Sequence, residues 1–464
     1  MERLARSSLR TYAEGQRRHY ERWLQRLVET PTVSSDPARR EDVARGAALA
    51  VELITSLGGR ARRVPTGGHP LVIGEFPGPK GAPTLTLYNH LDVQPADREA
   101  EGWRTEPFRF VKRKGRYYGR GTTDDKGPAL AALFGAAEAH RAGVPVTVKL
   151  LWETEEEIGS THLESTLVRL GSRVATDAVV VSDSAWLTRK TPTVTAGLRG
   201  FQGFLFRLET AEADAHSGIV GGAARNPLGE LMGLACALHD PRTGRVKVPG
   251  FYDDVVPLTR AEREDFRRSG FTVRGFRRDN RLRRLRTDDA LDVMERIWAQ
   301  PTFEIHGLAG GYHGPGLKAV VPPRAELKVS CRLAPGQKPA RIAKLITAFA
   351  RKHNPDIVAF AIRGGGPASR WEPTGPLAAA VKSAVRFAFG REPAFVRDGG
   401  TIGAVNTMQD VLRCPVGFLD LSMPDHGYHA PNENFEWAQA AAGMAAFAHL
   451  VEEWAGSRAG EGRS

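Results

Sequence analysis

The sequence contains few cysteines. Only three occur among its 464 residues, Cys236, Cys331 and Cys414, and no two of them form a Cys-x-x-Cys pair. Thiols this far apart exclude an all-thiolate metal site and argue against a disulfide framework. We therefore predict reduced cysteines in a cytoplasmic protein.

Long apolar runs are also missing. No stretch of eighteen apolar residues occurs, so we expect no membrane span and no membrane partner. The first residues, Met1–Arg6, lack the apolar segment of a secretory signal. The apolar fraction of 41% and the charged fraction of 25% are typical of a soluble globular protein.

Acidic residues are fewer than basic ones. The chain has 65 Lys and Arg against 53 Asp and Glu, a net charge of +12. Such an excess could indicate nucleic-acid binding, which a steep fall of affinity with salt would support. However, only residues 267–286 gather arginines densely, and a solvated basic helix face explains that stretch more simply. We therefore predict no nucleic-acid partner.

The order of apolar segments predicts a mixed α/β fold. At 464 residues the chain is too long for one ordinary domain. Strand-like segments alternate with helix-like ones, which favours a mixed, mostly parallel sheet flanked by helices. The expected strands are 71–76, 84–89, 146–152, 178–182 and 416–421, and the expected helices are 12–29, 41–58, 128–142, 376–389 and 437–455.

The middle of the chain has a different pattern. Strand-like segments at 197–210, 317–333 and 356–362 combine with helices at 226–239 and 340–353. This predicts an inserted α+β domain of ferredoxin-like β-α-β-β-α-β order, interrupted by an arginine-rich insertion at about 250–300. The predicted division is 1–195 and 367–464 for the outer domain and 196–366 for the inserted one.

Histidine and acidic residues follow several of the predicted strands. His90 and Asp92 follow the strand at 84–89, and residues two apart in an extended segment point to the same side. Glu156 and Glu157 follow the strand at 146–152, and Asp183 follows the strand at 178–182. Because ligands of open α/β sheets bind beyond the carboxyl ends of strands, we expect these clusters to converge.

Imidazole and carboxylate groups in one cluster indicate a metal site. This donor set suits zinc best, and also manganese or cobalt. Two cations sharing a carboxylate can polarise a carbonyl and lower the pKa of a water toward ~7. The adjacent Glu156 and Glu157 allow one side chain to bind metal and the other to act as a general base, a contribution of about 10²–10⁴ in rate. The sequence thus predicts a metal-dependent hydrolase.

Six short motifs, in order, resemble those of metallopeptidase family M20, whose members include carnosinases, dipeptidases, glutamate carboxypeptidases, aminoacylases and acetylornithine deacetylase. The resemblance is nearest to the dipeptidase branch and implies a zinc-exopeptidase-like fold with an inserted lid and dimerisation domain. The motifs span His90–Pro95, Gly119–Gly127, Glu155–Ser160, Ser182–Asp183, Asp214–Gly218 and His429–Glu433.

The resemblance assigns the metal ligands by motif position. It implies two divalent ions per subunit. His90 and Asp183 would hold one ion, Glu157 and His429 would hold the other, and Asp124 would bridge both.

The resemblance also assigns catalytic roles. Asp92 would orient and polarise His90, as carboxylates commonly do for metal-bound histidines, and Glu156 would be the general base. His426 is an alternative to His429 as a ligand, but the Ala-Pro-Asn-Glu that follows His429 favours the latter.

Three further residues are implied to bind substrate. His216 would reach the active site of the partner in a homodimer and stabilise the oxyanion there. Arg332 would bind a substrate carboxylate, and Thr401 lies in a second carboxylate-binding loop. We therefore expect hydrolysis of dipeptides or short peptides with a free carboxylate. The alternative is an amidohydrolase acting on N-acyl or N-carbamoyl amino acids.

Overall fold

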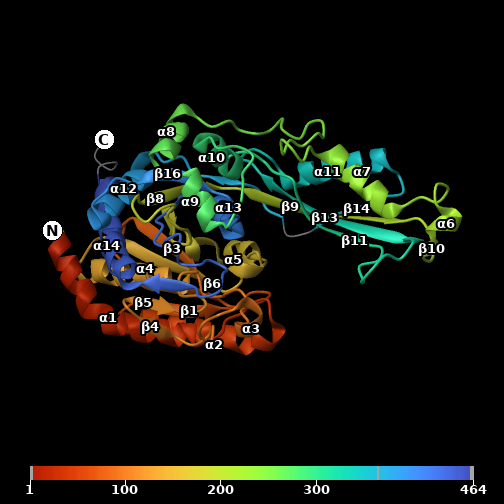
Figure 1. Ribbon diagram of the computed structural model, residues 1–464. Coiled ribbons are helices and arrows are strands. Elements are labelled where there is room, and N and C mark those ends of the chain that lie inside the picture. Colours follow the sequence, from red (N-terminus) through yellow and green to blue (C-terminus); the bar gives the residue numbers. More distant parts are fainter. Residues whose placement is uncertain (1–3, 363–364, 460–464) are drawn as a thin grey trace.

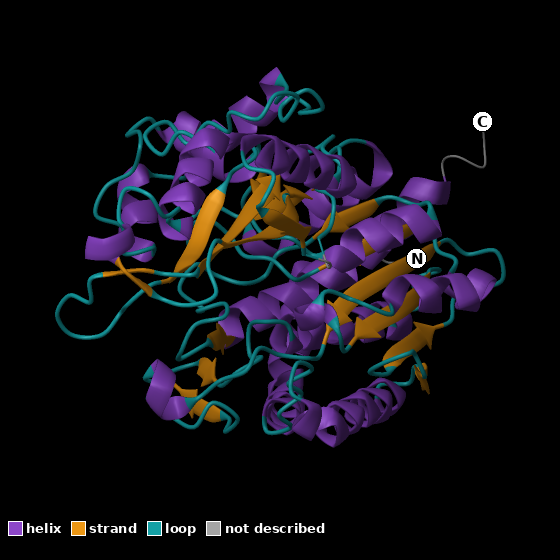
Figure 2. Ribbon diagram, turned by 90° about the vertical axis from the view of Figure 1, so that its right-hand side faces the viewer, coloured by secondary structure: helices purple, strands orange, loops and turns teal. Residues whose placement is uncertain are grey.

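The protein consists of a body that carries both ends of the chain and an elongated arm (Figure 1). The computed structural model describes residues 4–362 and 365–459. Helices lie on both sides of the strands of the body (Figure 2).

A six-stranded sheet forms the centre of the body. Its order is β1-β2-β6-β3-β7-β17, in which β6, β3, β7 and β17 are parallel, β2 pairs antiparallel with β6, and β1 pairs antiparallel with β2 at the edge. β7 consists only of buried alanine and valine, as expected for a strand covered on both faces. The bounds are β1 Arg60–Val64, β2 Leu71–Phe76, β3 Thr84–His90, β6 Thr147–Glu153, β7 Ala178–Val181 and β17 Val416–Phe418.

Helices cover this sheet. α4 packs against β3 and along α14, and a Cβ atom at Gly135 would lie 2.5 Å from the carbonyl oxygen of Met444. Only glycine permits this close approach of the two helices. The helices are α1 Arg6–Val28, α2 Arg40–Ser56, α4 Lys126–Arg141, α5 Leu163–Leu170, α12 Gly375–Phe389, α13 Gly403–Leu412 and α14 Trp437–Ala459.

Two small sheets complete the body. One has the order β15-β8-β16 and the other β18-β5-β4. The bounds are α3 Arg98–Glu101, β4 Val111–Arg113, β5 Arg116–Tyr118, β8 Thr193–Leu198, β15 Ser369–Arg370, β16 Ala394–Asp398 and β18 Asn434–Glu436, with 3₁₀ turns at Pro37–Arg39, Glu156–Ile158 and Gly171–Val174.

The arm is an antiparallel sheet of order β11-β13-β9-β14 with α7 and α11 packed against it. Its elements follow one another as β-α-β-β-α-β, which confirms the predicted type of inserted domain. The bounds are β9 Gly200–Glu209, α7 Pro227–Leu238, β11 Glu304–Gly310, β13 Arg324–Leu333, α11 Pro339–His353 and β14 Val358–Ala361. The tip carries β10 Ala215–His216, α6 Ser217–Val220 and β12 Val320–Val321 (Figure 1).

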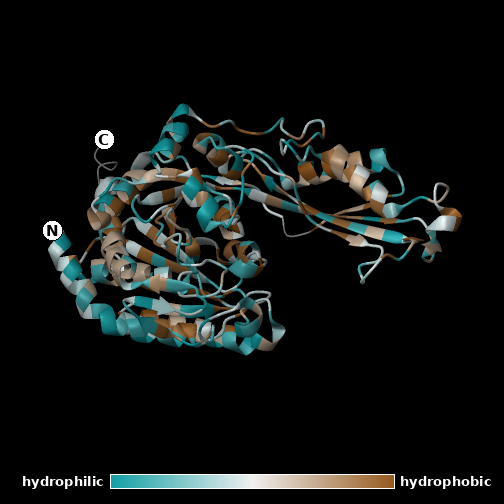
Figure 3. Ribbon diagram, in the orientation of Figure 1, coloured by the Kyte–Doolittle hydropathy of each residue, from teal (hydrophilic) through white to brown (hydrophobic). Residues whose placement is uncertain are grey.

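The arginine-rich insertion forms α8 Arg260–Arg268, α9 Val273–Asp279 and α10 Ala290–Trp298. Phe266 and Trp298 join a small core with Ala394 and Val396 of β16, so α8 and α10 pack on the body. α8 and α9 are coloured mainly hydrophilic in Figure 3. The exact limits of the inserted domain remain a prediction.

The sequence predicts neither a membrane span nor a disulfide framework. In residues 4–362 and 365–459, no helix has the length and hydropathy needed to cross a bilayer. Cys236, Cys331 and Cys414 are free thiols.

Candidate metal centre

Three neighbouring parallel strands bring their carboxyl ends to one edge of the central sheet. His90 ends β3 and pairs in register with Glu153 at the end of β6. Asp183 follows β7 by two residues, and β7 lies on the other side of β3. Each apolar strand ends where its polar cluster begins. Because the strands are parallel neighbours, their polar clusters lie at the same edge of the sheet.

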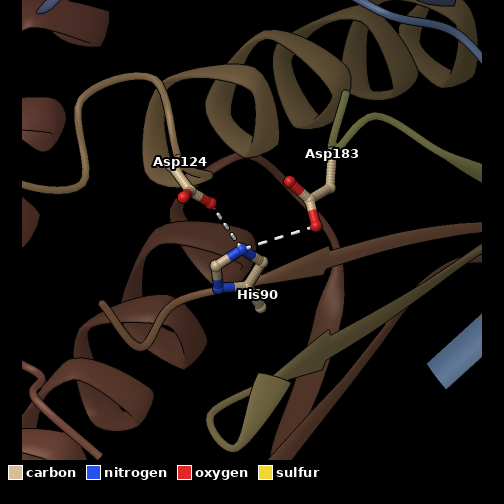
Figure 4. Close-up of side chains that lie close together, drawn as sticks. All are labelled: His90, Asp124 and Asp183. Carbon is tan, nitrogen blue, oxygen red and sulfur yellow. Dashed lines mark hydrogen bonds and ion pairs between the residues drawn. The ribbon is translucent and has the colours of Figure 1, made fainter. Parts of the chain in front are cut away.

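The first trio of side chains comprises His90, Asp124 and Asp183 (Figure 4). The Nε2 atom of His90 lies 2.9 Å from Oδ1 of Asp124 and 3.7 Å from Oδ2 of Asp183. All three side chains are buried. Asp124 comes from the loop before α4, so strand ends and a helix start both contribute.

The second trio comprises Asp124, Glu157 and His429. The Nε2 atom of His429 lies 3.0 Å from Oδ2 of Asp124 and 3.2 Å from Oε2 of Glu157. The two oxygens of Asp124 therefore face different histidines, His90 on one side and His429 on the other. The His429 side chain is 56% exposed, whereas that of His90 is fully buried, so the second trio is the more open one.

The donor set of both trios fits two divalent cations. In each trio the candidate ligand atoms lie within 4.8 Å of one another, and each trio offers one imidazole nitrogen with carboxylate oxygens. Such mixed ligands suit zinc, manganese or cobalt. One carboxylate shared between two trios is the arrangement that a bridging ligand requires.

The electrostatics of the site also call for positive charge. Burial raises the pKa of Asp183 and raises that of Glu156 well above its usual range; His90 opposes both shifts. Burial would also raise the pKa of Asp124, but hydrogen bonds from His429 and His90 hold it below its usual range. Several carboxylates are thus crowded in a space that excludes water.

Asp92 fastens the loop after β6 to the end of β3. Its Oδ1 accepts the backbone N–H of Glu156 at 3.2 Å, and its Oδ2 accepts the N–H of Glu157 at 3.0 Å and the hydroxyl of Ser34 at 2.7 Å. Nδ1 of His90 lies 3.5 Å from Oδ1 of Asp92 but only 3.0 Å from the carbonyl oxygen of Asp92. Asp92 thus positions both glutamates as well as the imidazole.

Glu433 has a structural role that the sequence did not reveal. Its buried carboxylate accepts hydrogen bonds from Arg120 Nη1 at 3.0 Å and from the N–H groups of Gly121, Thr123 and Asp124 at 2.9, 2.8 and 3.1 Å. It therefore ties the loop of Asp124 to the segment that follows His429. Its place in the motif at 429–433 was the available signal, but the sequence did not show its partners.

His426 lies outside both trios. Its Nδ1 accepts the N–H of Met423 at 3.0 Å and lies 3.1 Å from the hydroxyl of Thr123. Burial lowers its pKa to about 3. It is a buried neutral imidazole that holds loops together, while His429 contacts the candidate ligands.

The structure does not bring His216 to the trios within one chain. His216 is exposed at the tip of the arm, where its Nδ1 accepts the N–H of Gly218 at 3.0 Å (Figure 1). Arg332 and Thr401 do meet, since Nη1 of Arg332 donates to Oγ1 of Thr401 at 3.0 Å. Thr401 in turn donates to the carbonyl oxygen of Arg199 at 2.6 Å.

The sequence profile of Peptidase family M20/M25/M40 matches residues 86–453. The chain belongs to this family. The Beta-Ala-His dipeptidase of Homo sapiens is a relative with 32% identity, and the match covers 89% of this chain and 86% of that protein. The Cys-Gly metallodipeptidase dug1 of Schizosaccharomyces pombe is 32% identical over 93% of this chain and 94% of its own.

A solved structure of a family member has the same fold. The crystal structure of human carnosine dipeptidase 1 superposes with a TM-score of 0.84 at 29% identity, covering 98% of this chain and 100% of that one. The predicted family and fold are thus confirmed. The roles of individual M20 site residues remain predictions.

Proposed function

We propose that this M20 protein is a dinuclear metallodipeptidase that cleaves the amide bond of dipeptides or short peptides with a free carboxylate. The observation that carries the proposal is the sharing of Asp124 between two histidine-containing trios, with the backbone N–H of Glu156 held by Asp92 beside them. His90 and Asp183 would hold one divalent ion, and Glu157 and His429 the other.

The chain's own residues would then divide the chemistry between them. Two bound cations would polarise the scissile carbonyl and make a water more acidic. Glu156 would accept the proton of the attacking water and pass it to the leaving amine. Burial raises the pKa of Glu156, so its carboxylate would take up a proton more readily than that of an exposed glutamate. Asp92 would hold the backbone of Glu156 in place.

Substrate binding would involve residues away from the metal ligands. Arg332, held by Thr401, would form an ion pair with the carboxylate of the substrate. His216 belongs to β10, which lies at the tip of the arm, so it would serve a site only across a homodimer (Figure 1). The homodimer, zinc as the natural metal and a cytoplasmic location belong to the proposal.

A substrate panel tests the proposal. Purified protein loaded with zinc, manganese or cobalt would be assayed on dipeptides beside N-acetyl and N-carbamoyl amino acids, with a Glu156→Gln variant as the control. We expect metal-dependent release of amino acids from dipeptides, in keeping with the relatives named as dipeptidases. Activity confined to the acylated or carbamoylated amino acids would replace the dipeptidase proposal with the amidohydrolase alternative.

A further inference from the structure

A cavity with a strongly basic lining lies where the arm joins the body. Its volume is about 400 Å³, and four arginines but only one carboxylate, that of Glu304, line it. The arginines come from distant parts of the chain. They are Arg199 between β8 and β9, Arg286 before α10, Arg296 in α10 and Arg332 in β13.

Three of these guanidinium groups lack a carboxylate partner. Among the described residues, Arg199, Arg286 and Arg332 form no ion pair, whereas Arg296 is paired with Asp292 at 3.0 Å. Arg199 makes only long contacts of 3.4 Å to two backbone carbonyl oxygens. Burial and the nearby charge of Arg332 lower its pKa to about 10, against the charges of Asp398 and Glu304, which raise it. Arg199 and Arg332 are half-buried cations and Arg286 is an exposed one, and together they offer a site for an anion.

Part of the remaining lining is apolar, and its polar members are Thr287, Thr302, His306 and Ser330. Phe201, Phe276, Val293 and Ile297 contribute to the wall, and the guanidinium of Arg332 lies 5.2 Å from the centre of the Phe201 ring. A ligand with methylene groups behind an anionic end would bury those methylenes on this wall. A small inorganic anion would leave it uncovered.

A chain of contacts leads from the cavity to the loop that carries Glu157. Arg332 donates to Thr401, and Gly403 two residues later begins α13. A Cβ atom at Gly403 would lie 3.5 Å from the carbonyl oxygen of Gly159, which follows Glu157 by two residues. A peptide cleaved at the metal centre could therefore extend its C-terminal residue toward the four arginines.

We propose that this cavity recognises an acidic C-terminal residue, so that the preferred substrates are dipeptides ending in glutamate. Arg332 would take the main-chain carboxylate, while Arg199 and Arg286 would take the side-chain carboxylate. Because Arg286 belongs to the arginine-rich insertion, the insertion would determine specificity. This inference rests on the proposed dipeptidase function and adds the substrate class.

The test compares Ala-Glu with Ala-Gln, which have nearly the same shape and differ in charge. Charged hydrogen bonds of ~1.5–3 kcal/mol imply that the metal-loaded enzyme should prefer Ala-Glu by about tenfold or more in kcat/KM. Arg286→Gln, and likewise Arg199→Gln, should lower kcat/KM for Ala-Glu about tenfold more than for Ala-Gln. Arg284→Gln is the matched control, since Arg284 is exposed in the same insertion but does not line the cavity.

Binding gives a second measurement that does not need turnover. Calorimetry with free glutamate and glutamine should show about tenfold tighter binding of glutamate, and Arg286→Gln should remove the difference. Equal kcat/KM for the two dipeptides would overturn the inference and leave the proposed function intact. Selective binding of glutamate without hydrolysis of any peptide would support the anion site but overturn the proposed dipeptidase function. An Arg284→Gln effect as large as that of Arg286→Gln would also overturn it, because general charge would then explain the preference.

Discussion

Replacing Glu433 with glutamine should damage the metal centre without touching any proposed ligand. One carboxylate oxygen accepts the N–H groups of Thr123 and Asp124, and the other accepts those of Arg120 and Gly121. A glutamine amide can accept at one of these positions only, and its NH₂ group would face two donors at the other. Two hydrogen bonds to a buried charge would be lost, at about 1.5–3 kcal/mol each.

The expected total is a loss of ~3–6 kcal/mol, which should lower the Tm of metal-free protein by roughly 3–6 °C, because the unfolding entropy of a chain of this length is about 1 kcal/mol/K. Burial raises the pKa of Glu433 to about 7, so the measurement belongs at a pH well above that value, where the carboxylate is ionised. Because the hydrogen bonds that Glu433 accepts hold the loop of Asp124 in place, metal affinity should also fall by about 10–100-fold, as for other groups that orient ligands. Competition with a chromophoric chelator measures this fall.

Glu452→Gln is the matched control. Glu452 is also a buried carboxylate, but it lies on α14 and accepts the N–H of Leu4 at 2.8 Å. Its replacement should leave metal affinity unchanged. The reasoning is refuted if Glu433→Gln leaves both the Tm and the metal affinity at their wild-type values, or if Glu452→Gln weakens metal binding equally.

Three other predictions follow from the site. Glu156→Gln should lower kcat by about 10²–10⁴ with both metal ions still bound, whereas Asp124→Ala should lose metal from both positions in a metal analysis. His216→Ala alone should be nearly inactive, and mixing it with Glu156→Gln subunits should restore partial activity through mixed dimers. The unfolded chain should bind a proton at His426 near its usual pKa of 6.5 while the folded protein, with that pKa at about 3, does not. Stability should therefore fall as pH drops from 6.5 toward 3, and the Tm of metal-free His426→Gln should fall less steeply over that window.

Each of these has an opposing outcome. If Glu156→Gln lost metal as severely as Asp124→Ala, Glu156 would be a metal ligand and not the general base. Full activity of isolated His216→Ala, or no rescue in the mixture, would remove action across a dimer. Identical Tm profiles for wild type and His426→Gln would mean that the buried imidazole is not the group that titrates.

The sequence predicted the central sheet because local signals and tertiary structure agree there. β2 and β3 end close to where their apolar runs end, and His90 and Asp183 follow such runs directly. The same argument failed for β11, Glu304–Gly310, which contains two glycines and a histidine and lies on an edge of the arm sheet with its first three residues exposed. Its strand conformation comes from pairing with β13, which no local pattern encodes.

The remaining gaps concern contacts between distant segments. The packing of α8 and α10 on β16 joins residues about a hundred or more positions apart, and the basic cavity gathers arginines from three distant stretches of the chain. Glu433 and the loop that it holds are more than three hundred positions apart in the sequence. Residue types and motif order predicted the candidate ligands and the positioning role of Asp92, but not the role of Glu433.

The central claim is that Asp124 bridges two metal ions. A crystal structure of the metal-loaded protein, with anomalous diffraction measured at the absorption edge of the bound metal, tests it most directly. We predict two anomalous peaks roughly 3.5–4 Å apart, one beside His90 and Asp183, the other beside Glu157 and His429, with one oxygen of Asp124 on each. A single peak, or two peaks without Asp124 between them, would contradict the account.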